Sequence, residues 1–195
     1  MTTDRRQQIL AAADAIVSER GFPALSVRGV AARAGIGPST LRHYFPTQQD
    51  LYDAVVGRSF DTKVEDLRIT DETVAPAARL TECLLQFMPE DESALPALGT
   101  WLRTYAATLE PDRNEHVVRL LVSLTTHARS RVDSWLATLE AEGVLRSGPA
   151  DRHRTALLAV VDGLCLAMLT PGVRTPLAEA RAVLAHVVEN LVVTP

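Results

Sequence analysis

Hydrophobic residues recur three to four positions apart along almost the whole chain. Near the N-terminus, for example, Ile9, Leu10, Ala13, Ile16 and Val17 form one such stripe. No segment shows the sustained alternation of polar and β-branched apolar residues that is typical of a strand. The pattern therefore predicts an all-α fold built from amphipathic helices.

A sharp break separates two short helices in the first quarter of the chain. Ser26 is well placed to cap a helix over 27–34, and Gly35 to end it, because glycine adopts a positive φ without steric cost. Gly37 and Pro38 then begin a third helix, since proline lacks only an N–H that is unpaired in the first turn. These signals predict a helix-turn-helix, the unit whose second helix can enter the major groove of DNA.

The third helix separates its polar from its apolar side chains. Leu41 and Phe45, four residues apart, are predicted to face inward, which leaves the polar residues outside. Hydroxyl groups and tyrosine bind phosphates, and arginine can bond guanine O6 and N7 together. We expect the following residues at DNA: Ser26, Arg28, Pro38, Ser39, Thr40, Arg42, His43, Tyr44 and Gln48. The pattern alone leaves open a polar surface helix without a partner.

The charge distribution favours the same end of the chain. The protein has a net charge of -4, yet residues 1–46 hold six arginines against three acidic residues. Because salt screens charges beyond about 8–10 Å, a local basic face can bind phosphates within an acidic protein.

Residues 3–51, which include "ILAAADAIVSERGFPALSVRGVAARAGIGPSTLRHYFPTQQDL", resemble the DNA-binding domain of the TetR family of bacterial transcription regulators. The resemblance implies a recognition helix at 38–44, a fourth helix that links the domains, and a variable helical C-terminal domain that binds small molecules and dimerises. Arg42 stands where the family often has tyrosine, and Gln48 where it often has a phosphate-contacting lysine. The operator sequence is therefore not carried over, and Gln48 is at best a neutral phosphate contact.

This resemblance divides the chain into a helix-turn-helix DNA-binding domain, 1–47, and an effector-binding and dimerisation domain, 48–195. In the second domain the apolar stripe predicts a linking helix that extends to residue 67. The later helices are predicted over 76–88, 94–109, 112–142, 150–170 and 176–193.

The last two predicted helices carry unusually broad apolar surfaces. The segment "TALLAVVDGLCLAML" is apolar nearly all round, and a helix of that kind must be buried on every side. Pairing with a second copy of the chain would meet this need by forming a four-helix bundle, so we expect a homodimer. Gly163 would permit close approach of two helices, and Asp162 beside it is expected to be a hydrogen-bonded structural acid.

The helices between the two ends carry the aromatic residues that a small-molecule site would use. Aromatic surface with a few polar tips is typical of a largely apolar pocket, although a place in the core or on the surface is the more frequent explanation for each such residue taken alone. His116, close to the acidic stretch "EPDRNEH", is expected to be solvated. The candidate contacts for a small apolar or aromatic effector are Phe87, Met88, Trp101, Tyr105, His127 and Trp135.

The sequence carries no motif that supports an enzyme, a cofactor or a metal site. The sequence contains no GxSxG, P-loop, GxGxxG or HExxH motif and no paired cysteine ligands. Cys83 and Cys165 lie far apart, so we expect buried thiols. The longest apolar run is interrupted by Asp162 and is shorter than the roughly 20 residues of a membrane span. With no secretory signal either, a cytoplasmic location is expected.

The function predicted from these observations is a ligand-responsive, DNA-binding transcription regulator. Repression is the family default, so release from a palindromic operator by a small effector is the expected mode of control. Two alternatives stay open: a DNA-binding regulator controlled by a partner protein, and a small all-helical enzyme.

Overall fold

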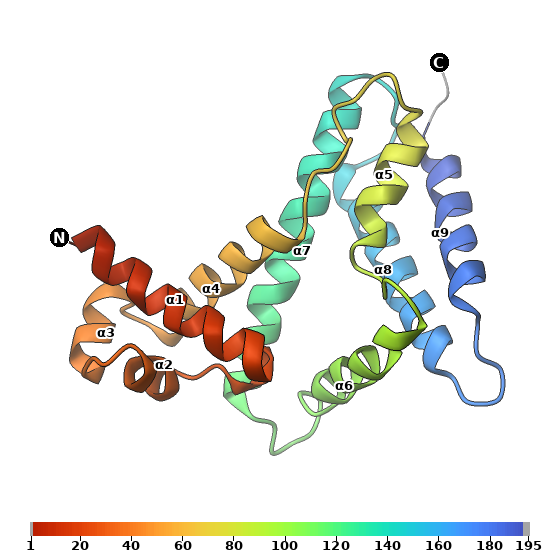
Figure 1. Ribbon diagram of the computed structural model, residues 1–195. Helices are drawn as coiled ribbons and strands as arrows, with labels where there is room; N and C mark the ends of the chain where they lie inside the picture. The colour runs from red at the N-terminus through yellow and green to blue at the C-terminus, as the bar shows by residue number, and fades with distance from the viewer. Residues whose placement is uncertain (1, 193–195) are drawn as a thin grey trace. The chain divides into compact units, whose positions relative to one another are not determined.

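The computed structural model describes residues 2–192, and for Thr2–Asp4 and Pro23 it describes the backbone alone. Within this range the chain forms nine α-helices, two short 3-10 helices and no strand, which confirms the all-α prediction (Figure 1). In the same range, none of the helices is both long enough and apolar enough to cross a membrane. The α-helices are α1 (Thr2–Arg20), α2 (Val27–Arg33), α3 (Pro38–Tyr44), α4 (Gln48–Lys63), α5 (Pro76–Leu85), α6 (Leu95–Ala106), α7 (Glu115–Ala141), α8 (Ala150–Leu169) and α9 (Leu177–Leu191).

The end of α4 differs from the sequence prediction. The helix stops at Lys63 rather than at residue 67, and Leu67 adopts a left-handed backbone with φ of 45°. Neither glycine nor proline occurs between these positions, so the sequence carries no local signal for the break. The segment after Lys63 is held by distant partners instead: the Asp66 carboxylate accepts a hydrogen bond of 2.8 Å from the Trp135 indole N–H.

The chain divides into two compact units that do not follow the order of the sequence. The N-terminal unit comprises Met1–Lys63 and Thr104–His127, and the C-terminal unit comprises Val64–Arg103 and Ala128–Pro195. The first part of α7 thus packs with α1–α4. The division at residue 47 follows the helix-turn-helix motif rather than this packing, and it stays a prediction.

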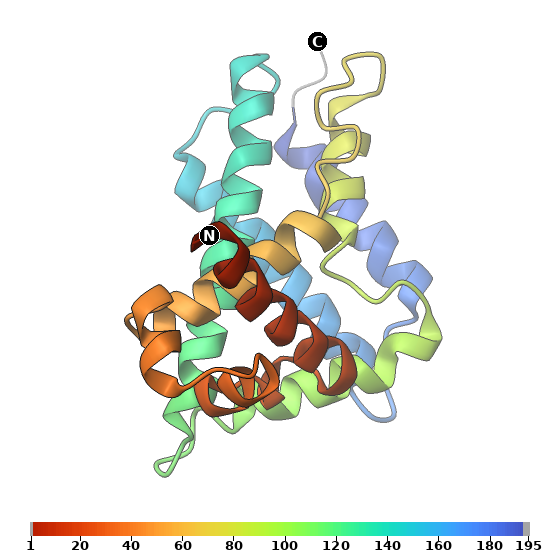
Figure 2. The same cartoon turned by 60° about the vertical axis from the view of Figure 1, so that its left-hand side comes forward.

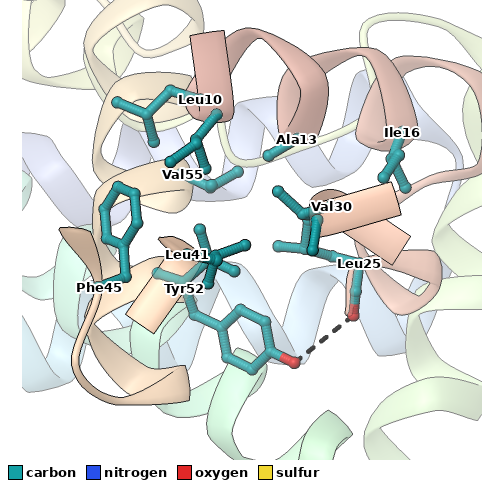
Figure 3. Packing of buried hydrophobic residues seen from close by; sticks show 12 residues of the cluster. Leu10, Ala13, Ile16, Leu25, Val30, Leu41, Phe45, Tyr52 and Val55 are labelled. Atoms are coloured by element: carbon teal, nitrogen blue, oxygen red, sulfur yellow. Dashed lines mark hydrogen bonds between the residues drawn. The ribbon is translucent and has the colours of Figure 1, made fainter. Parts of the chain in front are cut away.

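The core of the N-terminal unit is formed by side chains from α1, α2, α3 and α4. Figure 3 shows the helices converging on Leu41 and on Tyr52, whose hydroxyl lies 3.5 Å from the carbonyl oxygen of Leu25. Tyr52 is fully buried although it belongs to α4, so this helix completes the DNA-binding core and is not a mere connection. The buried cluster consists of Ile9, Leu10, Ala13, Ile16, Leu25, Val30, Ala31, Leu41, Phe45, Leu51, Tyr52 and Val55.

In the C-terminal unit, α9 packs against both α5 and α8, and Figure 2 gives a second view of these helices. A buried ion pair holds α5 to the end of α7, because Arg79 Nη1 and Nη2 donate to the two carboxylate oxygens of Glu142 at 2.9 and 2.5 Å. Arg79 is only 1% exposed. It also donates to the carbonyl oxygen of Ile69, and so closes the loop that precedes α5.

Both cysteines of the C-terminal unit are free thiols, Cys83 buried and Cys165 partly buried, as expected. Burial raises the pKa of Cys83 to about 12 and that of Cys165 to about 11. Since the thiolate is the reactive form, neither cysteine is a nucleophile at neutral pH.

Candidate functional site

The turn between α2 and α3 contains a glycine with positive φ, as the sequence predicted. Gly35 adopts φ of 65° and donates its N–H to Ala32 O at 3.2 Å, and Ile36 donates to Ala31 O at 3.0 Å. This pair of bonds closes the last helical turn and reverses the chain in a Schellman motif. The Ile36 side chain packs against the core, so the turn places α3 directly after α2 at a defined angle.

The outward face of α3 is polar, as predicted. Gly37 and Pro38 start the helix, while Leu41 and Phe45 are 1% and 2% exposed. Tyr44 is half-buried, with its ring edge-on to His43 at 5.2 Å between centroids. The residues left exposed on α3 are Pro38, Ser39, Thr40, Arg42 and His43. The polar residues among them therefore expose hydroxyl, guanidinium and imidazole groups on this short helix, where a ligand can bind them.

The arginines of this unit differ in what already binds them. Arg33 donates to Glu19 at 2.7 Å, and this guanidinium lowers the pKa of the Glu19 carboxyl through hydrogen bonding. Arg42 has no hydrogen bond or ion pair to any described residue, and Arg28 is exposed. Arg42 is thus available to a partner, whereas Arg33 is neutralised within the chain.

Two of the residues expected to contact DNA already form hydrogen bonds within the protein. The Ser26 hydroxyl accepts from the Gly29 N–H at 3.1 Å and caps α2, as predicted. Gln48 donates its amide to His116 Nδ1 at 2.9 Å and accepts from Arg119 Nη1 at 2.7 Å. DNA contacts by both residues stay predictions, and Gln48 would have to exchange partners to make one.

The expectation that His116 is solvated is wrong. Its ring is half-buried, bonded to Gln48 and set edge-on to Tyr52 with 5.0 Å between ring centroids. The acidic neighbours of His116 in the sequence favour a solvated ring. A second signal points the other way, because His116, Ser123 and His127 are spaced so that all three share one face of α7.

The candidate effector contacts fall into both compact units. In the C-terminal unit, the rings of Phe87 and Trp135 lie 5.8 Å apart, Met88 is buried and Trp101 is 39% exposed on α6. Trp135 is itself fully buried. In the N-terminal unit, Tyr105 is 48% exposed, whereas His127 packs on the ring of Phe60 with 5.9 Å between centroids. The structure thus brings Phe87 and Trp135 together and leaves Trp101 and Tyr105 open to solvent.

The expected hydrogen bond of Asp162 is absent among the described residues. The side chain lies on an exposed part of α8, and partial burial by its neighbours raises the pKa of its carboxyl. Asp162 is therefore not tied into the fold of the single chain.

Two family models match the chain. Residues 9–55 match the model of bacterial regulatory proteins of the tetR family, and residues 76–193 match the C-terminal model of BetI-type transcriptional repressors, which spans more than half of the chain. The protein belongs to the TetR family. It is a DNA-binding transcription regulator with a helix-turn-helix at its N-terminus.

Individual TetR-family relatives are similar along nearly the full length. The transcriptional regulator PksA of Bacillus subtilis is 28% identical, with 97% of this chain and 90% of PksA covered. A Rhodococcus protein described as a TetR-family regulator has a similar fold, with a TM-score of 0.62, 22% identity and coverage of 97% and 98%. The multidrug binding protein EbrR, solved with imidazole, is 26% identical with a TM-score of 0.56 and coverage of 98% and 96%.

Proposed function

We propose that this TetR-family regulator is a repressor that binds a palindromic operator as a homodimer and is released by a small aromatic effector. The observation that carries the DNA-binding part is the exposed polar face of α3, held by the buried Leu41 and Phe45. In this arrangement α3 of each copy enters the major groove of one half-site.

The residues proposed to contact DNA divide into two roles. Arg42 lacks a partner in the described chain and can bond guanine O6 and N7 with its two-pronged guanidinium. Ser39, Thr40 and Tyr44 supply hydroxyl groups for phosphates, which fix the position of the helix without reading sequence. His43 of α3 and Arg28 of α2 are exposed and supply further hydrogen-bond donors.

Replacement of Arg42 by alanine is expected to weaken binding to the specific operator by about 1–3 kcal/mol and binding to shuffled DNA much less. Lysine at the same position keeps the charge but loses the paired hydrogen bonds, so Arg42→Lys should recover shuffled-DNA binding without recovering specificity. Fluorescence anisotropy with a duplex selected from a randomised library and a shuffled duplex measures both. Equal losses on the two duplexes would make Arg42 a phosphate contact.

The dimer contact is proposed from the exposed face of α8. Ala156, Ala159, Gly163 and Leu166 are all exposed and follow one another at helical spacing, with Leu166 54% exposed. No atom lies within 4 Å of a Cβ built on Gly163, so this side of the helix is open in the single chain. A second copy packed on this face would bury the apolar side chains and allow close approach of the two helices.

The effector is proposed to contact Phe87 in the C-terminal unit. The Phe87 ring already packs on Trp135, and an aromatic ligand would extend this contact with the offset or edge-on geometry that rings prefer. Two solved structures of EbrR hold imidazole and proflavin, which are both planar nitrogen heterocycles. Control by a partner protein has no observation of this kind in its favour.

Proflavin is therefore a suitable probe, and Phe87→Ala should weaken its binding about tenfold, since aromatic contacts contribute roughly 0.5–1.5 kcal/mol beyond area. Val173→Ala, at a residue 77% exposed in the same unit, is the matched control and should bind normally. Quenching of tryptophan emission gives the affinity. Bound proflavin must also lower the affinity of the protein for its operator. If Phe87→Ala binds proflavin as tightly as the wild type, the effector site does not include Phe87.

We further propose that the protein acts in the cytoplasm and carries out no catalysis. Its relatives are named as regulators, and DNA is its ligand. Absence of turnover with any bound effector would support this part of the proposal.

A further inference from the structure

The guanidinium of Arg6 lies over the ring of Phe45, with 5.2 Å between the Arg6 Cζ atom and the ring centroid. Arg6 belongs to α1, and Phe45 directly follows the last residue of α3. A cation within about 6 Å of an aromatic centroid is attracted by the negative face of the ring. The two residues therefore join the beginning of α1 to the end of α3, in a contact that lies wholly within the N-terminal unit.

The pattern of α1 explains why Arg6 reaches this ring. Leu10 follows Arg6 by four positions, so it shares the same face of the helix, and it is only 3% exposed in the core. Arg6 itself is exposed one turn before this buried stripe. An arginine at such a position can lay its aliphatic stem along the edge of the core and keep its charged head in water. In Figure 3 the Leu10 side chain and the Phe45 ring lie at the same end of the core.

The Arg6 guanidinium keeps its hydrogen-bond donors free. Among the described residues it forms neither a hydrogen bond nor an ion pair, and its contact with Phe45 uses the ring alone. Arg58, which also reaches α1, differs because it donates to Asp14 at 2.9 Å and to Gln7 at 2.7 Å. Arg6 thus carries a positive charge that no described acid pairs with, on a side chain whose direction is set by an aromatic ring.

The corner between α3 and α4 brings no such charge of its own. Between His43 and Arg58 the chain contains no lysine or arginine, and it carries Asp50 and Asp53. Gln48, the first residue of α4, is neutral, and both ends of its side-chain amide already bind residues of α7. A cation that meets DNA at this corner therefore has to come from another helix, and Arg6 brings one from α1.

We propose that Arg6 is a further DNA contact, which binds a phosphate of the operator backbone beside the end of α3 while it stays on the Phe45 ring. This inference rests on the proposed binding of α3 in the major groove, because Phe45 directly follows that helix. The planar guanidinium can donate two parallel hydrogen bonds to a phosphate. The ring orders the side chain before DNA arrives, so less rotamer freedom is lost on binding.

A phosphate contact positions α3 on the duplex but does not read sequence. It also has a measurable signature, because each phosphate that a protein cation neutralises releases counterions. The slope of log K against the logarithm of the salt concentration changes by about 0.9 for each such contact. A residue that only supports the fold leaves this slope unchanged.

The test measures the affinity of Arg6→Gln for DNA by fluorescence anisotropy over a range of about 50 to 300 mM KCl, with a duplex selected from a randomised library and a shuffled duplex. Glutamine is a good helix former but carries no charge. We expect the slope to become shallower by about 0.9 for each Arg6 in the complex, or about 1.8 for the proposed homodimer. At about 0.1 M salt this is a loss of about tenfold per contact, equal on both duplexes.

Two further variants separate the charge of Arg6 from its shape and from the net charge of the protein. Arg6→Lys keeps the charge, so its slope should match the wild type, whereas its affinity should fall a few-fold because the ammonium lacks paired donors. Arg20→Gln is the matched control, since it removes an exposed arginine from the other end of α1. It lies about 21 Å along the helix from Arg6 and should change neither the slope nor the affinity.

A folded Arg6→Gln variant with the slope of the wild type would overturn the inference, and circular dichroism checks the fold. An equal change of slope in Arg20→Gln would also overturn it, because net charge alone would then be the cause. So would a loss confined to the selected duplex, which would make Arg6 a base contact. If the wild type does not prefer the selected duplex, the proposed operator binding fails instead, and the slope on the shuffled duplex still tests Arg6.

Discussion

Gly163→Leu is expected to convert the proposed homodimer to a monomer at micromolar concentration and to reduce operator affinity by at least about a hundredfold, since two linked half-sites bind far more tightly than one. The leucine side chain would separate the two α8 helices at their closest approach. Within one chain it meets no atom within 4 Å of its Cβ, and leucine is the better helix former, so the monomer should keep its fold. Analytical ultracentrifugation and circular dichroism measure the two effects.

The matched control is Ala137→Leu, which adds a bulky side chain at an exposed position of α7, outside the four residues of α8 that form the proposed contact. This variant should remain a dimer and bind the operator normally. A monomeric wild type, or a Gly163→Leu variant that still sediments as a dimer, would contradict the proposed interface and the palindromic operator that depends on it.

Glu142→Ala is expected to lower the free energy of unfolding by about 3 kcal/mol, the low end of the range for breaking a buried ion pair. The loss is large because Arg79 is left buried with its charge unpaired, and it stays at the low end because the Glu142 side chain retains 18% exposure. Urea unfolding followed by circular dichroism gives the value. Glu140→Ala, at an exposed residue two positions earlier, is the control and should change stability by less than about 0.5 kcal/mol.

The effect of Glu142 should also depend on pH. Hydrogen bonding and the charge of Arg79 hold the pKa of the Glu142 carboxyl below its ordinary value of about 4.3. The stabilisation is therefore present above pH 4.3 and is lost as the pH falls through the lower pKa of the folded state. The wild type and Glu142→Ala should approach each other in stability in strong acid; a constant difference would assign the effect to packing alone.

The helix-turn-helix could be predicted from sequence because its signals are local. Gly35 ends one helix, Gly37 and Pro38 start the next, and the inward position of Leu41 follows from helical spacing. Each of these features depends on residues within one turn of one another, where the chemistry of a single residue decides the backbone.

The end of α4 and the contact between α4 and α7 could not be predicted in the same way. Leu67 takes a left-handed conformation, and the Trp135 indole that binds Asp66 comes from 69 residues further along the chain. Likewise, Tyr52 and His116 are separated by 64 residues, and neither carries a sequence signal that names the other. Such features arise from tertiary packing, and they also determine why the first part of α7 joins the N-terminal unit.

The shortness of α3 has a consequence for how the regulator finds its sites in a genome. Seven residues at about 1.5 Å each span roughly 10 Å, the length of about three base pairs. A given sequence of three base pairs occurs about once every 64 base pairs by chance. One copy of the protein therefore cannot distinguish a single operator from the millions of competing positions in a genome. In the proposed homodimer two copies must match DNA together at a set separation, which squares that rarity. The choice of binding site is therefore a property of the proposed pair, and any variant that alters the separation of its two α3 helices should redirect the protein to different promoters without a change in its recognition residues.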